Sequence, residues 1–288
     1  MPKALFSSAQ EWALCGVTAL WGSTFLLVRM AMQESGPLWF VGLRFSCAAL
    51  ILACLSFPIL RDITKRELVG GAVLGAAIFA GFALQTAGLA TITASASAFI
   101  TAFYVPLVPF FECLFMKHKP GRLAWTGMAL AFPGVILLTG GDGFMTGLGM
   151  GEGLTLLCAI AFAGEIILTG IIVPGTNPRR IATVELMVGA LLSFAFMPLS
   201  GEVPAPFSWL VVGSACGLGL ASACIQSIIA WAQKDIPPTR ATIIYTGEPV
   251  WAGLIGYMAG ERLPLSALAG CVLVVTGILV SNRDGKKT

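Results

Sequence analysis

The chain has 288 residues, of which 57% are hydrophobic and only 11% are charged, with a formal net charge of +3 at pH 7. A soluble domain carries roughly 25% charged residues, so this chain cannot cover a water-facing surface and most of its surface must face lipid. The composition excludes a soluble enzyme or binding domain and predicts a polytopic membrane protein.

Ten segments are apolar over nearly the length, about 20 residues, that a helix needs to cross roughly 30 Å of hydrocarbon. In chain order they cover residues 12–32, 37–57, 68–89, 94–116, 123–140, 153–173, 182–200, 208–232, 238–259 and 264–281. They are too long and too evenly apolar for barrel strands with a period of two, so we predict an all-α fold without a soluble domain. The first segment contains Arg29 and has no cleavage site after it, so we expect it to be retained.

The cysteines predict neither disulfides nor a metal site. All eight lie inside the apolar segments and none belongs to a Cys-x-x-Cys pair: Cys15, Cys47, Cys54, Cys113, Cys158, Cys216, Cys224 and Cys271. Such cysteines are typical of helix packing, and we expect no metal and no cofactor.

The basic residues are distributed unevenly between the two sides of the predicted bundle. With the N-terminus inside, the cytoplasmic segments hold 14 of the 17 lysines and arginines, namely Lys3, Arg61, Lys65, Arg66, Lys117, Lys119, Arg122, Arg179, Arg180, Lys234, Arg240, Arg283, Lys286 and Lys287. Arg29 and Arg44 lie within spans, which leaves Arg262 alone outside. The positive-inside rule predicts both termini in the cytoplasm, in a plasma or bacterial inner membrane. The positive charge therefore indicates topology and not a nucleic-acid partner.

The two halves of the chain match in order. A shift of 141 residues aligns Pro37 with Pro178, Arg44 with Glu185 and Gln85 with Gln226, and a shift of 143 aligns Pro106 with Pro249, Gly127 with Gly270 and Gly134 with Gly277. We therefore divide the chain into residues 1–143 and 144–288, each with five helices. An odd number inverts the second half, which is typical of secondary transporters with a site near the midplane between the halves. The alternative is that both halves merely share helix-packing glycines.

Several short motifs resemble one transporter family. Trp21-Gly22-Ser23-Thr24-Phe25 resembles the drug/metabolite transporter superfamily in its EamA-type ten-helix branch, and so do Glu248-Pro249-Val250-Trp251, Gly260-Glu261-Arg262-Leu263 and the later Gly270 and Gly277. The chain departs from the pattern at His118, which stands where the repeat would place Glu261. The resemblance covers the whole chain and implies secondary or facilitated export of small metabolites by alternating access. The resemblance further implies amino acids as cargo, since they are the common theme of this branch, and an exporter of the aromatic amino acid kind.

Glu248 is the strongest single candidate for the site. It lies ten residues after Pro238, or about 15 Å into the membrane at 1.5 Å per residue, where a carboxylate costs on the order of 3 kcal/mol and should face the bundle interior. Pro249 removes one helix hydrogen bond and frees a carbonyl near Tyr245. The functional interpretation is a polar patch for a substrate amine or a proton. The structural interpretation is a kink in which a neighbouring hydroxyl caps Glu248.

The remaining candidates are polar or aromatic residues at central depth. They are Trp21, Phe25, Gln85, Phe99, Phe103, Phe162, Glu165, Gln226, Tyr245 and Trp251. Gln85 and Gln226 suit a zwitterion, or else they lock helices together, and Glu165 binds substrate or pairs with a neighbouring helix. The aromatic residues wall an apolar pocket or merely pack. Arg44 and Glu185 are repeat-equivalent, but inversion places them roughly 10 Å apart in depth, so we expect each to have its own partner.

The glycines Gly127, Gly134, Gly270 and Gly277 mark one face of helix five and one face of helix ten. Small residues let membrane helices approach closely. We expect these two helices to be peripheral, packed against each other or against another subunit in a homo-oligomer. The cavity should then be walled by helices one, three, four, six, eight and nine.

Two other classes are less well supported by the sequence. A membrane-embedded enzyme needs a catalytic constellation, and HExxH, GxSxG and GxxxxGK[ST] are all absent. A channel should carry a ring of like charges or a filter sequence, and neither is present. The expected partners are therefore a small-molecule substrate and the lipid bilayer. Multidrug or other lipophilic export is the alternative to amino acid export.

Overall fold

The computed structural model describes residues 8–92, 94–117, 121–138, 149–258 and 265–281. Throughout these residues the chain forms helices and no strands. The elements are α1 (Ala9–Ala31), α2 (Pro37–Leu60), α3 (Lys65–Leu89), α4 (Ala94–Thr101), α5 (Tyr104–Phe111), the π-helical turn η1 (Glu112–Met116), α6 (Arg122–Leu138), α8 (Met150–Ile172), α9 (Pro178–Ser200), α10 (Trp209–Ala232), α11 (Pro238–Tyr245), α12 (Glu248–Met258) and α13 (Leu265–Ser281). They correspond to the ten expected spans, of which the fourth and the ninth are broken.

Six helices, namely α1, α2, α3, α8, α9 and α10, are long and apolar enough to cross a membrane unaided. Several begin earlier than their apolar residues suggest, because a polar cap extends them. Ser8 caps α1 through the Glu11 amide, and Thr64 caps α3 through the Glu67 amide, each in a reciprocal capping box. The run of apolar residues therefore indicates which part of the helix lies in the membrane, but it does not indicate where the helix begins.

The two broken helices are interrupted at equivalent places in the two halves. The fourth span breaks between Thr101 and Tyr104, and the ninth breaks between Tyr245 and Glu248. In each case a proline follows closely, Pro106 or Pro249, and proline cannot donate the hydrogen bond that would continue the preceding helix. A proline is tolerated in the first turn of a new helix, so the chain restarts there.

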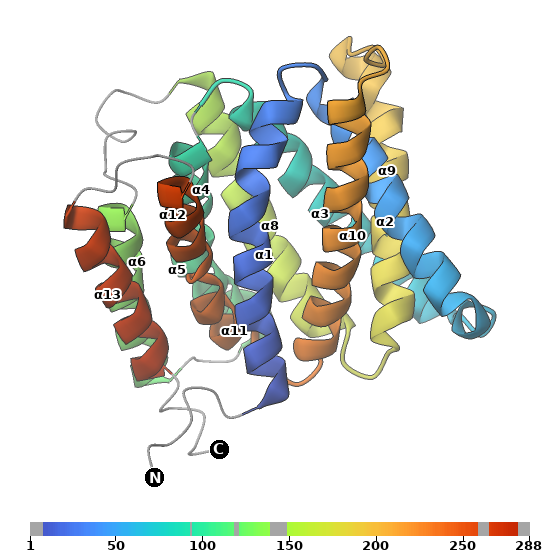
Figure 1. Cartoon of the computed structure of the whole chain (residues 1–288). Helices are drawn as coiled ribbons and strands as arrows, with labels where there is room; N and C mark the ends of the chain where they lie inside the picture. The colour runs from blue at the N-terminus through green and yellow to red at the C-terminus, as the bar shows by residue number, and fades with distance from the viewer. Residues whose placement is uncertain (1–7, 93, 118–120, 139–148, 259–264, 282–288) are drawn as a thin grey trace.

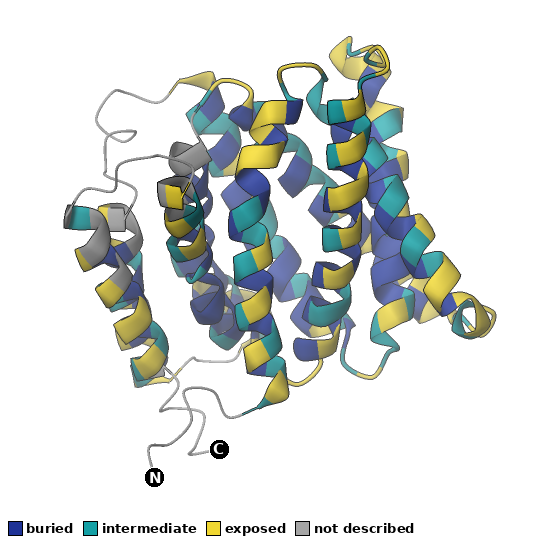
Figure 2. Ribbon diagram, in the orientation of Figure 1, coloured by how far each residue is buried: buried dark blue, intermediate teal, exposed yellow. Residues whose placement is uncertain are grey.

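The halves are inverted relative to each other (Figure 1). α1 runs upward in the view and its counterpart α8 runs downward, and the same opposition holds for α2 with α9 and for α3 with α10. α1 begins and α13 ends at the same end of the bundle. The surface of the described residues carries large apolar side chains such as Leu55 and Leu50, which are 72% and 65% exposed, while the buried positions face inward (Figure 2). This arrangement is that of an integral membrane protein.

α6 and α13 lie side by side at one edge of the bundle (Figure 1). A Cβ atom built on Gly134 would lie 2.9 Å from the Gly270 carbonyl oxygen, and one on Gly277 would lie 2.5 Å from the Gly127 oxygen. Only glycine leaves room for such close backbones. The expectation that these glycine faces pack against each other is confirmed.

Candidate functional site

A cavity lies between the two halves and contains about 530 Å³ of space unfilled by protein atoms. Its walls come from α1, α3, the fourth span, α8, α10 and α12, which are the six spans expected to form them. The lining residues are Trp21, Thr24, Phe25, Ile78, Phe82, Gln85, Thr101, Tyr104, Phe162, Glu165, Ile166, Gln226 and Glu248.

The structure brings seven of the eleven candidate residues to this cavity: Trp21, Phe25, Gln85, Phe162, Glu165, Gln226 and Glu248. Three others lie elsewhere. Phe103 packs against Phe132 with ring centroids 5.2 Å apart, Tyr245 is fully buried behind Trp21, and Trp251 is 37% exposed on α12. Phe99 lies in α4, but its side chain is outside the described part of the structure.

Glu248 is the first residue of α12 and lines the cavity with 8% of its surface exposed. No donor from the described residues hydrogen-bonds to its carboxylate, so a capping hydroxyl is not found among them. An unpaired carboxylate at this depth is costly. Its position leaves it available to a cation or a proton inside the cavity.

Gly22 explains how α1 reaches the break beside Glu248. A Cβ atom on Gly22 would lie 2.7 Å from the Ala252 amide nitrogen and 2.9 Å from the Glu248 carbonyl oxygen. Because these neighbours are backbone atoms, only glycine lets the helices approach so closely. The approach places the neighbouring Trp21 and Phe25 at the cavity wall. The motif that begins at Trp21 and the motif that begins at Glu248 are therefore in contact in the structure.

The glutamines both line the cavity and link helices. Gln85 Nε2 donates to Thr101 Oγ1 at 3.2 Å, which joins α3 to α4, and Gln226 Nε2 donates to Glu185 Oε1 at 2.8 Å, which joins α10 to α9. Thr169 Oγ1 donates to Glu165 Oε1 at 3.2 Å within α8. Glu165 is thus bonded within its own helix and also contacts the Gln226 side chain of the neighbouring α10. Each glutamine retains a carbonyl oxygen as an acceptor.

The apolar part of the cavity is built from aromatic rings. Phe82 and Phe162 meet edge to face at 5.3 Å, one from each half, and Trp21 meets Tyr245 in the same geometry at 5.1 Å. Gln233 donates to the Tyr245 hydroxyl at 3.3 Å. Such pairs are worth about 0.5–1.5 kcal/mol beyond the buried area. Tyr245 therefore supports Trp21 from behind.

The end of the bundle where α1 begins is closed by contacts between the halves. Glu11 pairs with Arg240, and the Glu112 carboxylate accepts hydrogen bonds from the Thr239 amide and hydroxyl. The Glu112 side chain is buried, with only 1% of its surface exposed. It caps the start of α11, where a carboxylate satisfies unpaired amides.

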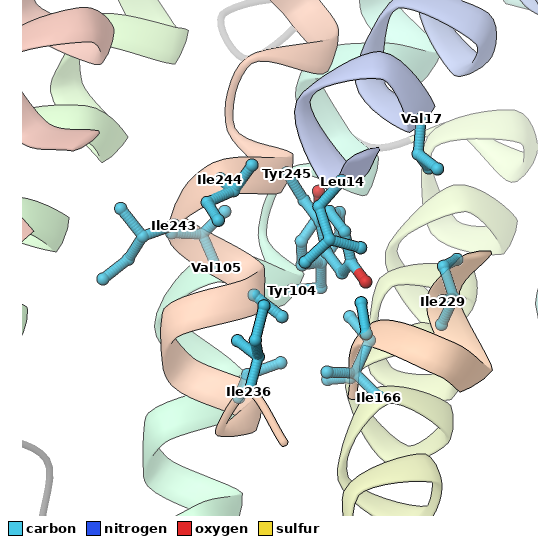
Figure 3. Packing of buried hydrophobic residues seen from close by; sticks show 14 of the residues in the cluster. Leu14, Val17, Tyr104, Val105, Ile166, Ile229, Ile236, Ile243, Ile244 and Tyr245 are labelled. Carbon is cyan, nitrogen blue, oxygen red and sulfur yellow. The ribbon is translucent and has the colours of Figure 1, made fainter. Parts of the chain in front are cut away.

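A cluster of buried apolar residues lies between these polar contacts and the cavity. It includes Leu14, Val17, Tyr104, Val105, Ile229, Ile236, Ile243, Ile244 and Tyr245, and Figure 3 shows these side chains gathered around the two tyrosines. Leu14 lies seven residues before Trp21, which places it roughly 10 Å closer to the N-terminal end of α1. The cluster and the polar contacts together form what we call the closed end.

Several lining residues were missed from sequence. Phe82 and Ile78 lie three and seven residues before Gln85, so helical periodicity from Gln85 identifies both. Thr24 belongs to the same motif as Trp21. Tyr104 carries no comparable signal, because the break rotates the residues on its two sides differently.

The comparisons with known proteins agree with this architecture. A model of a family described as "EamA-like transporter family" matches residues 10–140 and, a second time, residues 149–283. The chain belongs to the EamA-like transporter family. The family's unit thus occurs twice in this transporter, once in each half.

Relatives of this EamA-like transporter cover nearly its whole length. A protein of Archaeoglobus fulgidus described as "Uncharacterized transporter" is 28% identical over 95% of this chain and 86% of its own. The Escherichia coli (strain K12) "Uncharacterized inner membrane transporter YedA" is 29% identical over 93% of this chain and 89% of its own. A solved structure described as "Crystal structure of protein" covers 97% of this chain and 99% of its own with a TM-score of 0.78 at 14% identity, which shows the same fold.

Proposed function

We propose that this membrane transporter exports small metabolites by alternating access, as a secondary or facilitated carrier, and that amino acids with large hydrophobic or aromatic side chains are its cargo. The observation that carries the proposal is the central cavity, where aromatic rings surround the carboxylate of Glu248, which accepts no hydrogen bond from the described residues. The family supports transport in general. The cargo is inferred from the chemistry of the cavity.

An amino acid offers three groups that this cavity can satisfy. Its ammonium is attracted to Glu248 or Glu165, its polar atoms can bond to Gln85 or Gln226, and its apolar side chain fits among the rings. Hydrogen bonds to charged groups contribute about 1.5–3 kcal/mol each.

A lipophilic drug or metabolite is the second candidate, and one observation favours it. A carboxylate beside aromatic rings also suits an organic cation, since cations bind to the faces of aromatic rings as well as to carboxylates. The distinguishing group is the substrate carboxylate, which a lipophilic cation lacks.

The inverted halves support alternating access. Transporters built this way rock one half against the other around a fixed central site. At the closed end, the halves are joined by the Glu11–Arg240 pair and by Glu112 bonded to Thr239. Breaking these few polar contacts and separating the apolar cluster would open the cavity at that end. We further propose that the closed end faces the cytoplasm, because the basic loops lie on its side.

The proposal is tested by uptake into proteoliposomes that contain the purified full-length protein. The panel consists of labelled phenylalanine, tyrosine, leucine, alanine and glutamate, with tetraphenylphosphonium as a lipophilic cation. We expect saturable uptake that is highest for the large apolar amino acids, with protein-free liposomes as the control. Uptake of the cation while every amino acid stays at background would overturn the amino acid assignment and favour the second candidate.

A further inference from the structure

Arg44 is a buried cation without a role in the transport cycle proposed above. It lies on α2 with 2% of its surface exposed. Its Nε donates to Ser222 Oγ on α10 at 2.7 Å, and its guanidinium carbon lies 4.6 Å from the centre of the Phe82 ring. Its Nη2 atom is buried and has no hydrogen-bond partner. Nor does any carboxylate of the described residues form an ion pair with it.

An incompletely paired guanidinium in this position is unusual. Arginine carries five N–H donors and keeps its charge in proteins, and buried charges are ordinarily paired because an uncompensated one costs several kcal/mol. The repeat-equivalent Glu185 does not compensate it, because Glu185 accepts from Gln226 instead. The expectation that Arg44 and Glu185 have separate partners is confirmed, but the partners of Arg44 are a neutral hydroxyl and a ring.

Arg44 lies directly behind the wall of the central cavity. A second, smaller gap surrounds it, too tight in this structure to hold a water molecule, and its lining residues are Trp21, Arg44, Phe45, Ile78, Phe82, Ser222, Ile225 and Gln226. Four of these residues, Trp21, Ile78, Phe82 and Gln226, also line the central cavity. The two spaces therefore share a wall, and the Phe82 ring, which covers the guanidinium, is part of it.

We propose that Arg44 is the binding site for the carboxylate of the transported substrate, with Phe82 as a movable ring between the two spaces. This inference rests on the proposed function and narrows it to substrates that carry an anionic group. A carboxylate fits the planar, bidentate geometry of a guanidinium. The ammonium, which in an amino acid is attached to the same carbon atom as the carboxylate, is then attracted to Glu165 or Glu248.

A purely structural role is the competing interpretation. In that interpretation Arg44 only joins α2 to α10 through Ser222 and stacks on Phe82, and small molecules never reach it. A helix lock accounts for the bond from Nε and for the ring contact. It leaves Nη2 without a partner, whereas a substrate carboxylate would supply one. The two interpretations predict different results when the Arg44 guanidinium is removed. A substrate site predicts weaker binding of anions, whereas a helix lock predicts no change.

The test measures binding to the purified full-length protein and does not depend on transport. The probes are 3-phenylpropanoate, which has the ring and the carboxylate, and 2-phenylethylamine, which has the ring and the ammonium. Calorimetry gives the dissociation constant of each. We expect Arg44→Gln to weaken binding of 3-phenylpropanoate by roughly 10- to 100-fold and to leave 2-phenylethylamine within about threefold of wild type. Arg61→Gln, which removes an exposed arginine at the end of α2, is the matched control and should change neither.

A second variant keeps the test decisive if Arg44→Gln does not fold. Ser222→Asp places a carboxylate where the Nε atom already has its partner, so it should pair with the guanidinium, keep the protein folded and occupy the site from within. It should abolish 3-phenylpropanoate binding. Wild-type affinity for 3-phenylpropanoate in either folded variant, or no binding to the wild-type protein, would overturn the proposal. The two proposals can also fail separately. If the variants lose binding of 3-phenylpropanoate but the wild-type protein transports no amino acid, the anion site is upheld and only the amino acid cargo is refuted.

Discussion

The contact of Gly22 with the ninth span offers a stability prediction with a matched control on the same helix. In Gly22→Ala the new methyl group would lie 2.7 Å from the Ala252 nitrogen and 2.9 Å from the Glu248 oxygen, whereas contacts closer than 3.4 Å are already tight. The backbone must therefore shift by roughly half an ångström or more. In Gly16→Ala, on the exposed side of α1, the methyl group would meet no atom within 4 Å.

We expect the two substitutions to change the free energy of unfolding in opposite directions. Overpacking against backbone costs about 1–3 kcal/mol, while replacing a helical glycine by alanine gains up to about 1 kcal/mol. We expect Gly22→Ala to lose about 1 kcal/mol or more of unfolding free energy and Gly16→Ala to be neutral or more stable. A change of this size shifts the melting temperature by roughly 2–4 °C per kcal/mol.

The assay is thermal unfolding of both variants in the same detergent, followed by the intrinsic tryptophan fluorescence. A second consequence should accompany the first, because a displaced α1 carries Trp21 and Phe25 with it. Binding of 2-phenylethylamine should therefore weaken in Gly22→Ala and not in Gly16→Ala. Equal melting temperatures in the two variants would refute the close approach of α1 to α12 and, with it, this account of the motif.

Three further predictions concern the cavity, its closed end and the topology. Glu248→Gln keeps the shape of the side chain but removes its charge, so the KM for phenylalanine should rise about 10- to 100-fold; an unchanged KM would leave Glu248 a structural residue. Glu11→Gln keeps a capping side chain at its position in the helix but removes the ion pair, so water-soluble maleimide should label the native Cys15 several-fold faster than in wild type, and an equal rate would show that the pair does not hold this end closed. In a background without native cysteines, Asp62→Cys and Val203→Cys should be labelled from opposite sides of the membrane, inside and outside respectively; labelling of both from one side would contradict the inverted arrangement.

Much of this fold follows from sequence, because the membrane limits the choices. The ten spans, the inversion and the glycine-lined pair of α6 and α13 all depend on length, charge and spacing, which are visible in the sequence. The depth of Glu248 was likewise countable from Pro238. The glycine faces excluded only helices five and ten from the cavity, and the six spans that were expected to wall it do line it.

The rotation of each helix about its axis was harder to predict. α3 is apolar on nearly all sides, so apart from the position of Gln85 its pattern does not distinguish a lipid-facing residue from one that faces the cavity. The breaks add a second difficulty. Trp251 lies three residues after Glu248 in the same helix, α12, yet its side chain is partly exposed, which its spacing did not predict. Phe103 and Tyr104 are adjacent, and only Tyr104 reaches the cavity.

The partners of the buried charges were also beyond the sequence. The bond between Arg44 and Ser222 joins residues 178 apart, and that between Glu112 and Thr239 joins residues 127 apart. Neither pairing follows from the repeat, which aligns Arg44 with Glu185. These contacts depend on which helices become neighbours, and that is decided by packing of the whole bundle.

The most direct test of the central claim, that the cavity between the inverted halves carries substrate across the membrane, is counterflow in proteoliposomes. Vesicles are preloaded with a high concentration of unlabelled phenylalanine and diluted into a trace of labelled phenylalanine. A carrier that alternates around one site predicts a transient accumulation of label above its equilibrium level, which should disappear when the lumen contains no amino acid. Label that enters at the same rate whether or not the lumen is loaded would show an open pathway or mere leakage, and would contradict the account.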